Sequence, residues 1–422
     1  MTKTVIVGAG PTGAALAYLL ARQGLEVTLI EAAPDFERLF RGEGLMPSGL
    51  DALVQMDLQS LLDQIPTQTI QRWEMLVEGC PVVQIDEPAG LQTTIVSQPA
   101  FLKAVVAKAQ QYPGFRFMQG SVQALIYQQE RVAGVRGNQA GAMQEIAADL
   151  VIGTDGRGST LRRLADLRLQ RRDYDSNLLW FRLPAPLPVP QRSIFYGFIR
   201  GSESLGAYSS WDGSLKLAYI LPRDTAFDWK NLDWPTRLAA IGPDWFATHL
   251  QTHAAALEAP VLLNVLFGCC PRWFRPGLLL LGDAAHPMAP IRAQGINLAL
   301  RDVIVAVNQL APLLKANGTA SAIDQALAQI QAEREPEIRR AQTLQQHEQG
   351  QANLIAQQPL LRQALRLAAP LTRPLISRRW LSRQKDLRYG ASLVRLAPDF
   401  APDGLKFRMQ VDNPTLDAAP SA

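Results

Sequence analysis

A glycine-rich turn near the N-terminus, set between a strand pattern and a helix pattern, constrains this chain more than any other feature. The β-branched run Thr4–Val7 leads into Gly8-Ala9-Gly10-Pro11-Thr12-Gly13, and the Ala/Leu-rich segment Ala14–Arg22 follows. A second apolar run, Glu26–Ile30, completes a strand–helix–strand unit that ends at Glu31. This arrangement is typical of a Rossmann-like α/β domain that binds a dinucleotide.

Each residue type in this unit has a physical reason. Gly8 permits the tight turn, Gly10 lets the backbone approach a pyrophosphate, and Gly13 lets the helix pack closely on the strand. The helix N-terminus presents N–H groups and a partial positive charge to the phosphates. Glu31 would accept hydrogen bonds from ribose hydroxyls, which favours FAD or NAD over NADP. The candidate dinucleotide-binding residues are therefore Gly8, Gly10, Pro11, Thr12, Gly13 and Glu31.

Two later segments repeat the pattern of an apolar strand followed by a loop and a helix start. The strand pattern Ala148–Ile152 runs into a loop that contains Asp155-Gly156-Arg157. The strand pattern Gly277–Leu281 runs into Gly282-Asp283-Ala284-Ala285-His286-Pro287. An extended FAD needs acidic strand ends at both of its ends, whereas NAD does not, so these segments favour FAD.

The three motifs, in this order, resemble those of the FAD-dependent aromatic hydroxylases, the group A flavoprotein monooxygenases typified by p-hydroxybenzoate hydroxylase. The resemblance extends from about residue 4 to residue 345. Two fainter matches support it. Arg41 falls where the family places an arginine near the flavin, and Gln98 falls where the family has Arg or Gln.

The resemblance implies roles for the residues of the later motifs. Asp283 would contact the ribityl hydroxyls, and the segment from Pro290 to Asn297 would line the isoalloxazine. The helix that opens near Gly295 would direct its N–H groups at flavin N1 and O2, where reduced flavin carries negative charge. Arg157 is associated in the family with NAD(P)H access, or it is simply paired. The further cofactor-binding residues implied are Asp155, Gly282, Asp283, Pro290, Gly295, Ile296 and Asn297.

Arg292 departs from the hydroxylase pattern, which usually has a small residue at this position. It could contact substrate, close on the flavin or face solvent, and these three alternatives stay open. The flavin-proximal candidates for a catalytic role are Arg292, Pro290 and Gly295. We expect His286 to fix its loop rather than to act as a general base. The sequence contains no cysteine and histidine spacing typical of a metal site.

The region between the flavin motifs predicts an inserted mixed β-sheet domain that binds substrate. Several short strand patterns in it contain aromatic side chains suited to an aromatic or polycyclic substrate. Because strands alternate, only about half of these side chains can face the cavity. They are Trp180, Phe195, Tyr208, Trp211 and Tyr219. We predict an FAD-binding domain at 1–170 and 266–345, a substrate domain at 171–265, a helical region at 346–411 and a disordered tail at 412–422.

The C-terminal region is basic and apolar. Residues 362–395 contain nine Lys or Arg and one acid, Asp386. Such a helix could lie on an anionic membrane surface, or it could be a solvated face packed on the FAD domain. The whole chain has a net charge of only +4, which argues against a nucleic-acid partner. No signal peptide pattern is visible, so we expect a cytoplasmic, or membrane-peripheral, protein.

These observations predict an enzyme that binds FAD noncovalently and is reduced transiently by NAD(P)H. It would hydroxylate an aromatic or polycyclic substrate with O2 through a C4a-hydroperoxyflavin. The alternatives are a flavin-linked reductase of an isoprenoid-type substrate and a non-catalytic flavin-binding redox sensor. A flavin halogenase is disfavoured because the pattern WxWxIP is absent.

Overall fold

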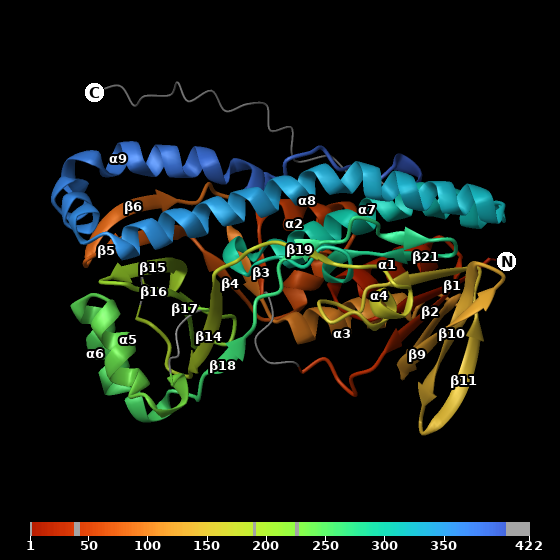
Figure 1. The fold of residues 1–422 in the computed structure, drawn as a ribbon, viewed down its shortest axis with the longest axis horizontal. Coiled ribbons are helices and arrows are strands. Elements are labelled where there is room, and N and C mark those ends of the chain that lie inside the picture. The colour runs from red at the N-terminus through yellow and green to blue at the C-terminus, as the bar shows by residue number, and fades with distance from the viewer. Residues whose placement is uncertain (1, 38–42, 189–190, 224–227, 402–422) are drawn as a thin grey trace.

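Two main β-sheets lie side by side along the molecule, and one long helix runs over both (Figure 1). The computed structural model describes residues 2–37, 43–188, 191–223 and 228–401. Arg41 and the predicted tail 412–422 therefore lie outside the described residues. The α/β class with an inserted sheet and C-terminal helices is confirmed.

The first sheet carries the N-terminal strand–helix–strand unit. Its strands follow the order β20-β21-β12-β1-β2-β8, and all neighbours are parallel except β20 and β21. The strands are β1 (Lys3–Val7), β2 (Glu26–Glu31), β8 (Phe115–Gln119), β12 (Leu150–Gly153), β20 (Phe274–Arg275) and β21 (Leu278–Leu280). Parallel strands buried by helices read as continuous apolar runs, which is why β1, β12 and β21 were visible in the sequence.

Helix α1 (Pro11–Arg22) begins three residues before the predicted Ala14, because proline suits the first turn of a helix. Small Ala and Gly side chains on α1 allow it to pack closely, and all residues from Thr12 to Ala21 are buried. The long helix α7 (Gln294–Lys315) packs on α1 within the same hydrophobic core.

The second sheet has seven strands in the order β18-β14-β17-β16-β15-β5-β6. They are β5 (Arg72–Val77), β6 (Cys80–Asp86), β14 (Ser176–Leu183), β15 (Ile194–Arg200), β16 (Glu203–Ser209), β17 (Leu215–Pro222) and β18 (Val261–Leu263). The sheet thus extends beyond the predicted range 171–265, because β5 pairs in parallel with β15. Helices α5 (Trp234–Ile241) and α6 (Asp244–Thr252) close a separate core on one face.

Smaller elements accompany the two main sheets. A three-stranded sheet near the cavity pairs β3, β7 and β4, and an antiparallel meander of β9, β10 and β11 projects beside the first sheet. A two-stranded ladder joins β13 and β19. The bounds are β3 (Gly44–Leu45), β4 (Thr67–Ile70), β7 (Thr93–Val96), β9 (Ser121–Gln128), β10 (Arg131–Gln139), β11 (Ala142–Ala147), β13 (Gln170–Arg171), β19 (Gly268–Cys269), α2 (Pro47–Gln55), α3 (Gln98–Ala109) and α4 (Thr160–Leu164).

Helices α8 (Ala320–Gln357) and α9 (Pro359–Tyr389) run antiparallel along one side of the molecule (Figure 1). Helix α8 passes over both sheets, whereas α9 packs on β6 of the second sheet. The predicted domain boundary at 345/346 falls inside α8, so the C-terminal region continues the FAD-binding part without a break. The segment Ile291–Lys315 is long and apolar enough to cross a membrane, yet 78% of its most apolar window is buried. It is the core helix of this fold.

Candidate active site

The turn between β1 and α1 is shaped by close approaches that only glycine allows. Gly8 has a φ of +101°, and a Cβ there would lie 2.5 Å from the carbonyl oxygen of Thr154. A Cβ on Gly13 would lie 1.9 Å from the carbonyl oxygen of Gly8. The Thr154 hydroxyl donates to the carbonyl oxygens of Val7 and Gly8, which ties the ends of β1 and β12 together. The first two motifs therefore form one surface.

That surface has room for a diphosphate. A Cβ added at Gly10 or Gly156 would meet no described atom within 4 Å, and both residues line a cavity of about 380 Å³. Pro11 and Thr12 line the same cavity. The backbone N–H groups of the first turn of α1 have no partner within the helix by geometry, so they suit phosphate oxygens.

Glu31 and Asp155 hold the loops around this surface. The Glu31 carboxylate accepts hydrogen bonds from the N–H groups of Ala9, at 2.8 Å, and Ala33, at 2.9 Å. The Asp155 carboxylate accepts from the Ser159 hydroxyl and from two N–H groups at the start of α4. Asp155 is thus a helix-capping residue, and contact of either carboxylate with FAD stays a prediction.

The third motif brings Asp283 to the cavity from the loop after β21. Gly282 has a φ of +58°, and a Cβ there would lie 2.5 Å from the Thr12 hydroxyl oxygen, so this loop presses directly on the first motif. Asp283 lines the cavity, and its Oδ1 lies 3.6 Å from the Cβ position of Gly295. Gln98 also lines the cavity. Residues from all three motifs therefore lie around one cavity.

The segment from Pro290 to Asn297 divides between the cavity and the core. Pro290, Gly295 and Ile296 line the cavity, as expected. Asn297 is fully buried instead, and its amide accepts from the N–H of Met46 and donates to the carbonyl oxygens of Gly44 and Ala293. Asn297 therefore joins α7 to β3 rather than facing the flavin site. From the sequence alone, an asparagine that hydrogen-bonds to the backbone is hard to distinguish from one that binds the cofactor.

Arg292 does not face solvent, so that alternative is wrong. Its side chain is only 10% exposed, and its Nε lies 3.0 Å from an Oε of Glu348 on α8. The guanidinium carbon lies 4.7 Å from the ring centre of Trp73 and 4.3 Å from that of Trp380. A φ of 59° turns the residue into this position. Arg292 lines the cavity and also joins the flavin loop, the second sheet and α9.

His286 fixes its loop, as expected from the sequence. Its Nε2 lies 2.7 Å from Oδ2 of the fully buried Asp302 on α7, and its ring packs against Trp273. Asp302 also accepts from Nε of Arg334 at 2.8 Å. Burial by itself raises the pKa of Asp302, but the charges of His286 and Arg334 outweigh it and hold the pKa below its ordinary value.

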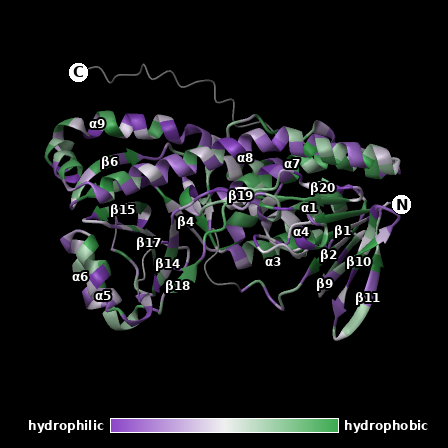
Figure 2. Cartoon of the chain, in the orientation of Figure 1, coloured by the Kyte–Doolittle hydropathy of each residue, from purple (hydrophilic) through white to green (hydrophobic). Residues whose placement is uncertain are grey.

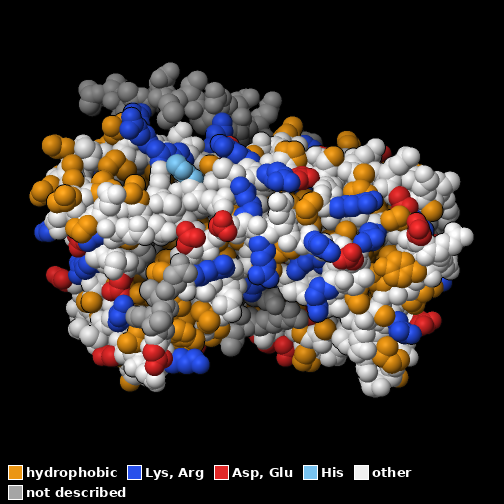
Figure 3. Space-filling model, viewed as in Figure 1, with side chains coloured by type: hydrophobic (Ala, Val, Ile, Leu, Met, Phe, Trp, Pro, Cys, Tyr) orange, Lys and Arg blue, Asp and Glu red, His pale blue; other side chains and the backbone are white. Residues whose placement is uncertain are grey.

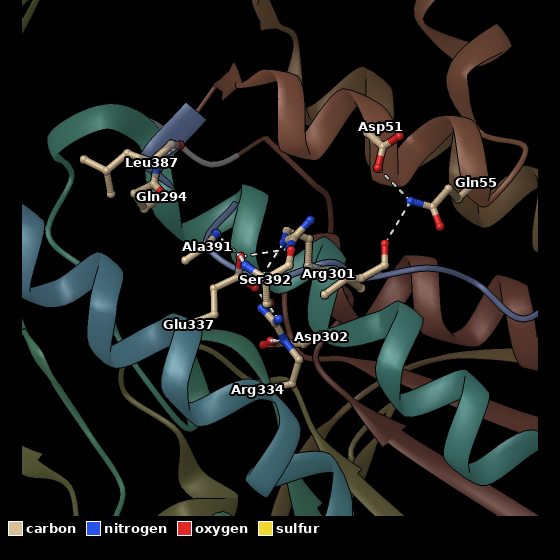
Figure 4. Close-up of polar contacts among 11 residues, drawn as sticks. Asp51, Gln55, Gln294, Arg301, Asp302, Arg334, Glu337, Leu387, Ala391 and Ser392 are labelled. Carbon is tan, nitrogen blue, oxygen red and sulfur yellow. Dashed lines mark hydrogen bonds and ion pairs between the residues drawn. The ribbon is translucent and has the colours of Figure 1, made fainter. Parts of the chain in front are cut away.

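A buried ion network extends from Asp302 to the C-terminal end of the chain (Figure 4). Arg334 on α8 also pairs with Glu337, which in turn accepts from Arg301 on α7 and from the N–H of Ala391. Burial opposes the charge of Glu337, yet the two arginines lower its pKa. The sequence analysis did not identify this network, because its members are spread over nearly a hundred residues. It fixes α7, whose N-terminus faces the cavity.

The opposite side of the cavity is formed by the second sheet. Of the five aromatic residues expected there, Trp180, Phe195 and Tyr208 line the cavity. The Tyr219 hydroxyl instead donates to Glu203. Trp211 is not part of the lining, but it packs from behind against a cluster that is, which includes Met46, Ile70 and Ile95. This division agrees with the expectation that about half would face inward.

Sequence reasoning missed the contribution of β5. Trp73 lies against Phe195, with ring centres 4.4 Å apart, and Phe195 stacks on Tyr208 at 5.8 Å. Trp73 also donates from Nε1 to the buried carboxylate of Glu87. Polar and apolar residues alternate from Arg72 to Met75, which is the signal of a strand, but no local signal says which sheet it joins. Glu43, which also lines this side, was likewise missed.

Comparisons with known proteins agree with this geometry. The family model described as FAD binding domain (FAD_binding_3) matches residues 1–345. The chain therefore belongs to this family of FAD-binding proteins. It is an FAD-dependent monooxygenase, so the predicted family, FAD as the cofactor and the enzyme class are confirmed.

Individual relatives extend the comparison. The chain is 29% identical to 6-methylpretetramide 4-monooxygenase of Streptomyces rimosus over 96% of each protein. It is 26% identical to a probable NADH-specific resorcinol 4-hydroxylase of Rhodococcus jostii, covering 79% of this chain and 62% of that protein. The solved structure of p-nitrophenol 4-monooxygenase PnpA from Pseudomonas putida superposes with a TM-score of 0.75 at 15% identity, over 93% of this chain and 99% of that one. This last likeness concerns the fold.

Proposed function

We propose that this enzyme hydroxylates a polycyclic aromatic compound within the cavity between the two sheets. The observation that carries the proposal is the stack of Trp73, Phe195 and Tyr208 facing the flavin motifs. Flat rings bind flat ligands through large apolar contact at low entropic cost. One relative is named for 6-methylpretetramide and another for resorcinol, a single-ring phenol.

The residues around the cavity fit FAD. Bound FAD, once reduced by NAD(P)H, supplies the activation of O2 and the transfer of one oxygen atom. The glycine turn and the first turn of α1 would hold the diphosphate, and Asp283 would hold ribityl hydroxyls. The N-terminus of α7, which begins beside Gly295, would stabilise negative charge on the ring system. The apolar walls exclude water from the reacting atoms.

The two alternative functions, a flavin-linked reductase and a redox sensor, would require a different cavity from that of a hydroxylase. A flexible prenyl chain has no need of stacked rings, and a sensor needs no substrate cavity at all. The proposal is tested with protein reconstituted with FAD, NADH or NADPH, and a panel of polycyclic phenols under isotopically labelled O2. We expect co-substrate oxidation and O2 uptake to rise together with a ligand, and the product to carry one labelled oxygen. Oxidation of NAD(P)H without incorporation into any ligand would contradict it.

We further propose that α9 holds this otherwise cytoplasmic enzyme on an anionic membrane surface. Leu360, Leu367 and Leu371 are 86%, 77% and 89% exposed, and Leu375 lies on the same face. Hydrophobic side chains gather at the end of the molecule where α8 passes into α9, with Lys and Arg beside them (Figures 2 and 3). Exposed Arg366 completes the pattern of an interfacial helix, in which leucines enter the lipid and arginines meet phosphates.

Vesicle flotation tests this contact. The wild-type protein should float with vesicles that contain phosphatidylglycerol and stay behind with pure phosphatidylcholine. Leu367→Glu combined with Leu371→Glu should abolish flotation, whereas Met143→Glu, which changes an exposed side chain on β11, should not. Equal flotation of all three proteins would refute membrane contact through α9. A dimer that dissociates in the leucine variant would indicate a second copy of the chain as the partner instead.

A further inference from the structure

Glu43 places a carboxylate on the substrate side of the cavity, in a wall that is mostly apolar or aromatic but also contains Thr93 and Arg292. It precedes β3, and its carbonyl oxygen accepts from the N–H of Val96, which fixes its backbone. The side chain is 12% exposed and lines the cavity. The other acid in the lining, Asp283, belongs to the flavin loop. Glu43 is therefore the carboxylate that a ligand stacked on the second sheet would meet.

The carboxylate is held in place from behind. The hydroxyl of Ser210, just after β16, donates to Oε2 at 2.8 Å. The ammonium of Lys216 on β17 lies 3.9 Å from Oε1. Ser210 is 1% and Lys216 8% exposed, and neither lines the cavity. The side chain of Trp211 adds a further hydrogen-bonding contribution. These three partners still leave acceptor capacity on a carboxylate that has about four lone-pair sites.

Two charged groups act on Glu43, namely Lys216 on β17 and Asp212 in the turn before it, and Glu43 in turn acts on Tyr208. Burial is the largest influence and raises the pKa of Glu43, Lys216 opposes this, and Asp212 adds to it. Burial also keeps Tyr208 protonated by raising its pKa, with the charge of Glu43 as the next cause. A negative charge in this wall attracts hydrogen-bond donors and repels ligand carboxylates.

We propose that Glu43 determines substrate class by accepting a hydrogen bond from a ring hydroxyl of a neutral aromatic substrate and by excluding substrates that carry a carboxylate. This inference rests on the proposed function, because it assumes that the aromatic ring stacks beside Trp73 and Phe195. The hydroxyl then points to the β3 edge of the cavity. The hydrogen bond between this hydroxyl and Glu43 fixes which edge of the substrate ring faces the flavin loop.

The test uses FAD-loaded enzyme and three probes of one shape: 2-naphthol, 2-methoxynaphthalene and 2-naphthoate. Dissociation constants come from the change in flavin absorbance. The wild-type enzyme should bind the naphthol about tenfold more tightly than the ether, the ratio expected for one hydrogen bond to a charged acceptor, and the naphthoate most weakly. Glu43→Gln should reduce the naphthol-to-ether ratio several-fold and strengthen naphthoate binding.

Glu74→Gln is the matched control, because Glu74 lies on β5 of the same sheet with 14% exposure but outside the cavity lining. It should leave all three constants unchanged. The preference of the wild-type for naphthol should be complete above the raised pKa of Glu43 and fall as the pH drops through it, while Glu43→Gln shows no such step. A merely structural role would not produce this pH step.

The possible failures separate the two proposals. Equal ratios in wild-type and Glu43→Gln, or tightest binding of naphthoate by the wild-type, would overturn the role of Glu43 and leave the aromatic hydroxylase intact. Failure of the FAD-loaded wild-type to bind any of the three probes would overturn the aromatic substrate class and the role of Glu43 together.

Discussion

On the cofactor side of the cavity, the backbone packs so closely at Gly8 and Gly13 that there is no room for a side chain. On the substrate side, the wall is instead formed by side chains, among them the rings of Trp73 and Phe195. The cofactor side is made by short contiguous motifs, each at the end of a parallel strand. The substrate side is made by single residues from strands far apart in the chain. A cofactor common to a whole family needs the first kind of site, and a substrate that differs between members needs the second.

The largest loss of stability should come from replacing a closely packed glycine on the cofactor side by a residue with a side chain. Gly13→Val places a Cβ 1.9 Å from the carbonyl oxygen of Gly8, so the helix must move off the strand. We expect a loss of more than about 4 kcal/mol in the free energy of unfolding and no retained FAD. Thermal melts and the flavin absorbance of purified protein measure both.

Gly24→Ala is the control for this substitution. Gly24 has a φ of +78° but open space around its Cβ position, so only backbone strain of about 1 kcal/mol should result. If Gly13→Val were no worse than Gly24→Ala, the close packing of the glycine turn would not be what forms the cofactor side.

A second prediction examines the one part of the cofactor side that depends on distant side chains. Arg334→Met leaves Asp302 and Glu337 buried without their shared partner, which should cost about 3–5 kcal/mol of stability. Arg339→Met on the same helix removes an exposed pair with Glu335 and should cost less than about 1 kcal/mol. Urea denaturation compares them. Equal costs would show that the ion network does not support α7.

A third prediction concerns Arg292, which joins the two sides. Arg292→Ala should raise KM for an aromatic substrate about tenfold. The substitution removes the contact of the guanidinium with Trp73 and Trp380, which stabilises this wall of the cavity by about 1–2 kcal/mol, so substrate binding weakens. The flavin midpoint potential should stay unchanged, because Glu348 neutralises the guanidinium at 3.0 Å. Steady-state kinetics and a reductive titration test this.

Arg292→Lys separates the two possible causes. Lysine keeps the positive charge but has no planar guanidinium to lie over the indole rings of Trp73 and Trp380. It should therefore behave like Arg292→Ala. Recovery of the wild-type KM in Arg292→Lys, or a shifted potential in Arg292→Ala, would assign charge rather than stacking as the function of this residue.

The smallest of the four predicted changes should come from replacing a single aromatic ring on the substrate side. Phe195→Leu should weaken aromatic ligand binding by about 1 kcal/mol and leave FAD affinity unchanged. Phe198 lies on the same strand but is buried in the core beneath α6, so Phe198→Leu should reduce stability without affecting the ligand. Titrations of ligand and of FAD distinguish the two. A weaker FAD affinity in Phe195→Leu would contradict the division of the cavity into two sides.

This division also explains how much the sequence could predict. Strand β1, the glycine turn and helix α1 were readable because the residues that touch are close in the chain. Asp283 was readable because it follows a buried strand, and parallel strands end at the same edge of the sheet. Asn297 and Arg292 were placed in the right segment, but their directions depend on β3, α8 and α9, which no local pattern connects to them.

The pairing of β5 with β15 joins residues more than a hundred positions apart, so Trp73 could not be assigned to the cavity from the sequence. Glu43 could not be assigned either, because it precedes β3, which pairs with the distant strand β7. Alternation indicates a strand, but it does not indicate its neighbour. The buried pair of Arg334 and Asp302 could not be predicted either, because charged residues on a helix usually face solvent.

The most direct test of the central claim is a crystal structure of the FAD-loaded enzyme with 2-naphthol. We predict that the cofactor extends from the turn at Gly10 to Asp283. Its ring system should lie between Gly295 and the stack of Trp73 and Phe195, with the naphthol hydroxyl within hydrogen-bonding distance of Glu43. An isoalloxazine outside this cavity, or a naphthol bound away from the second sheet, would contradict the account.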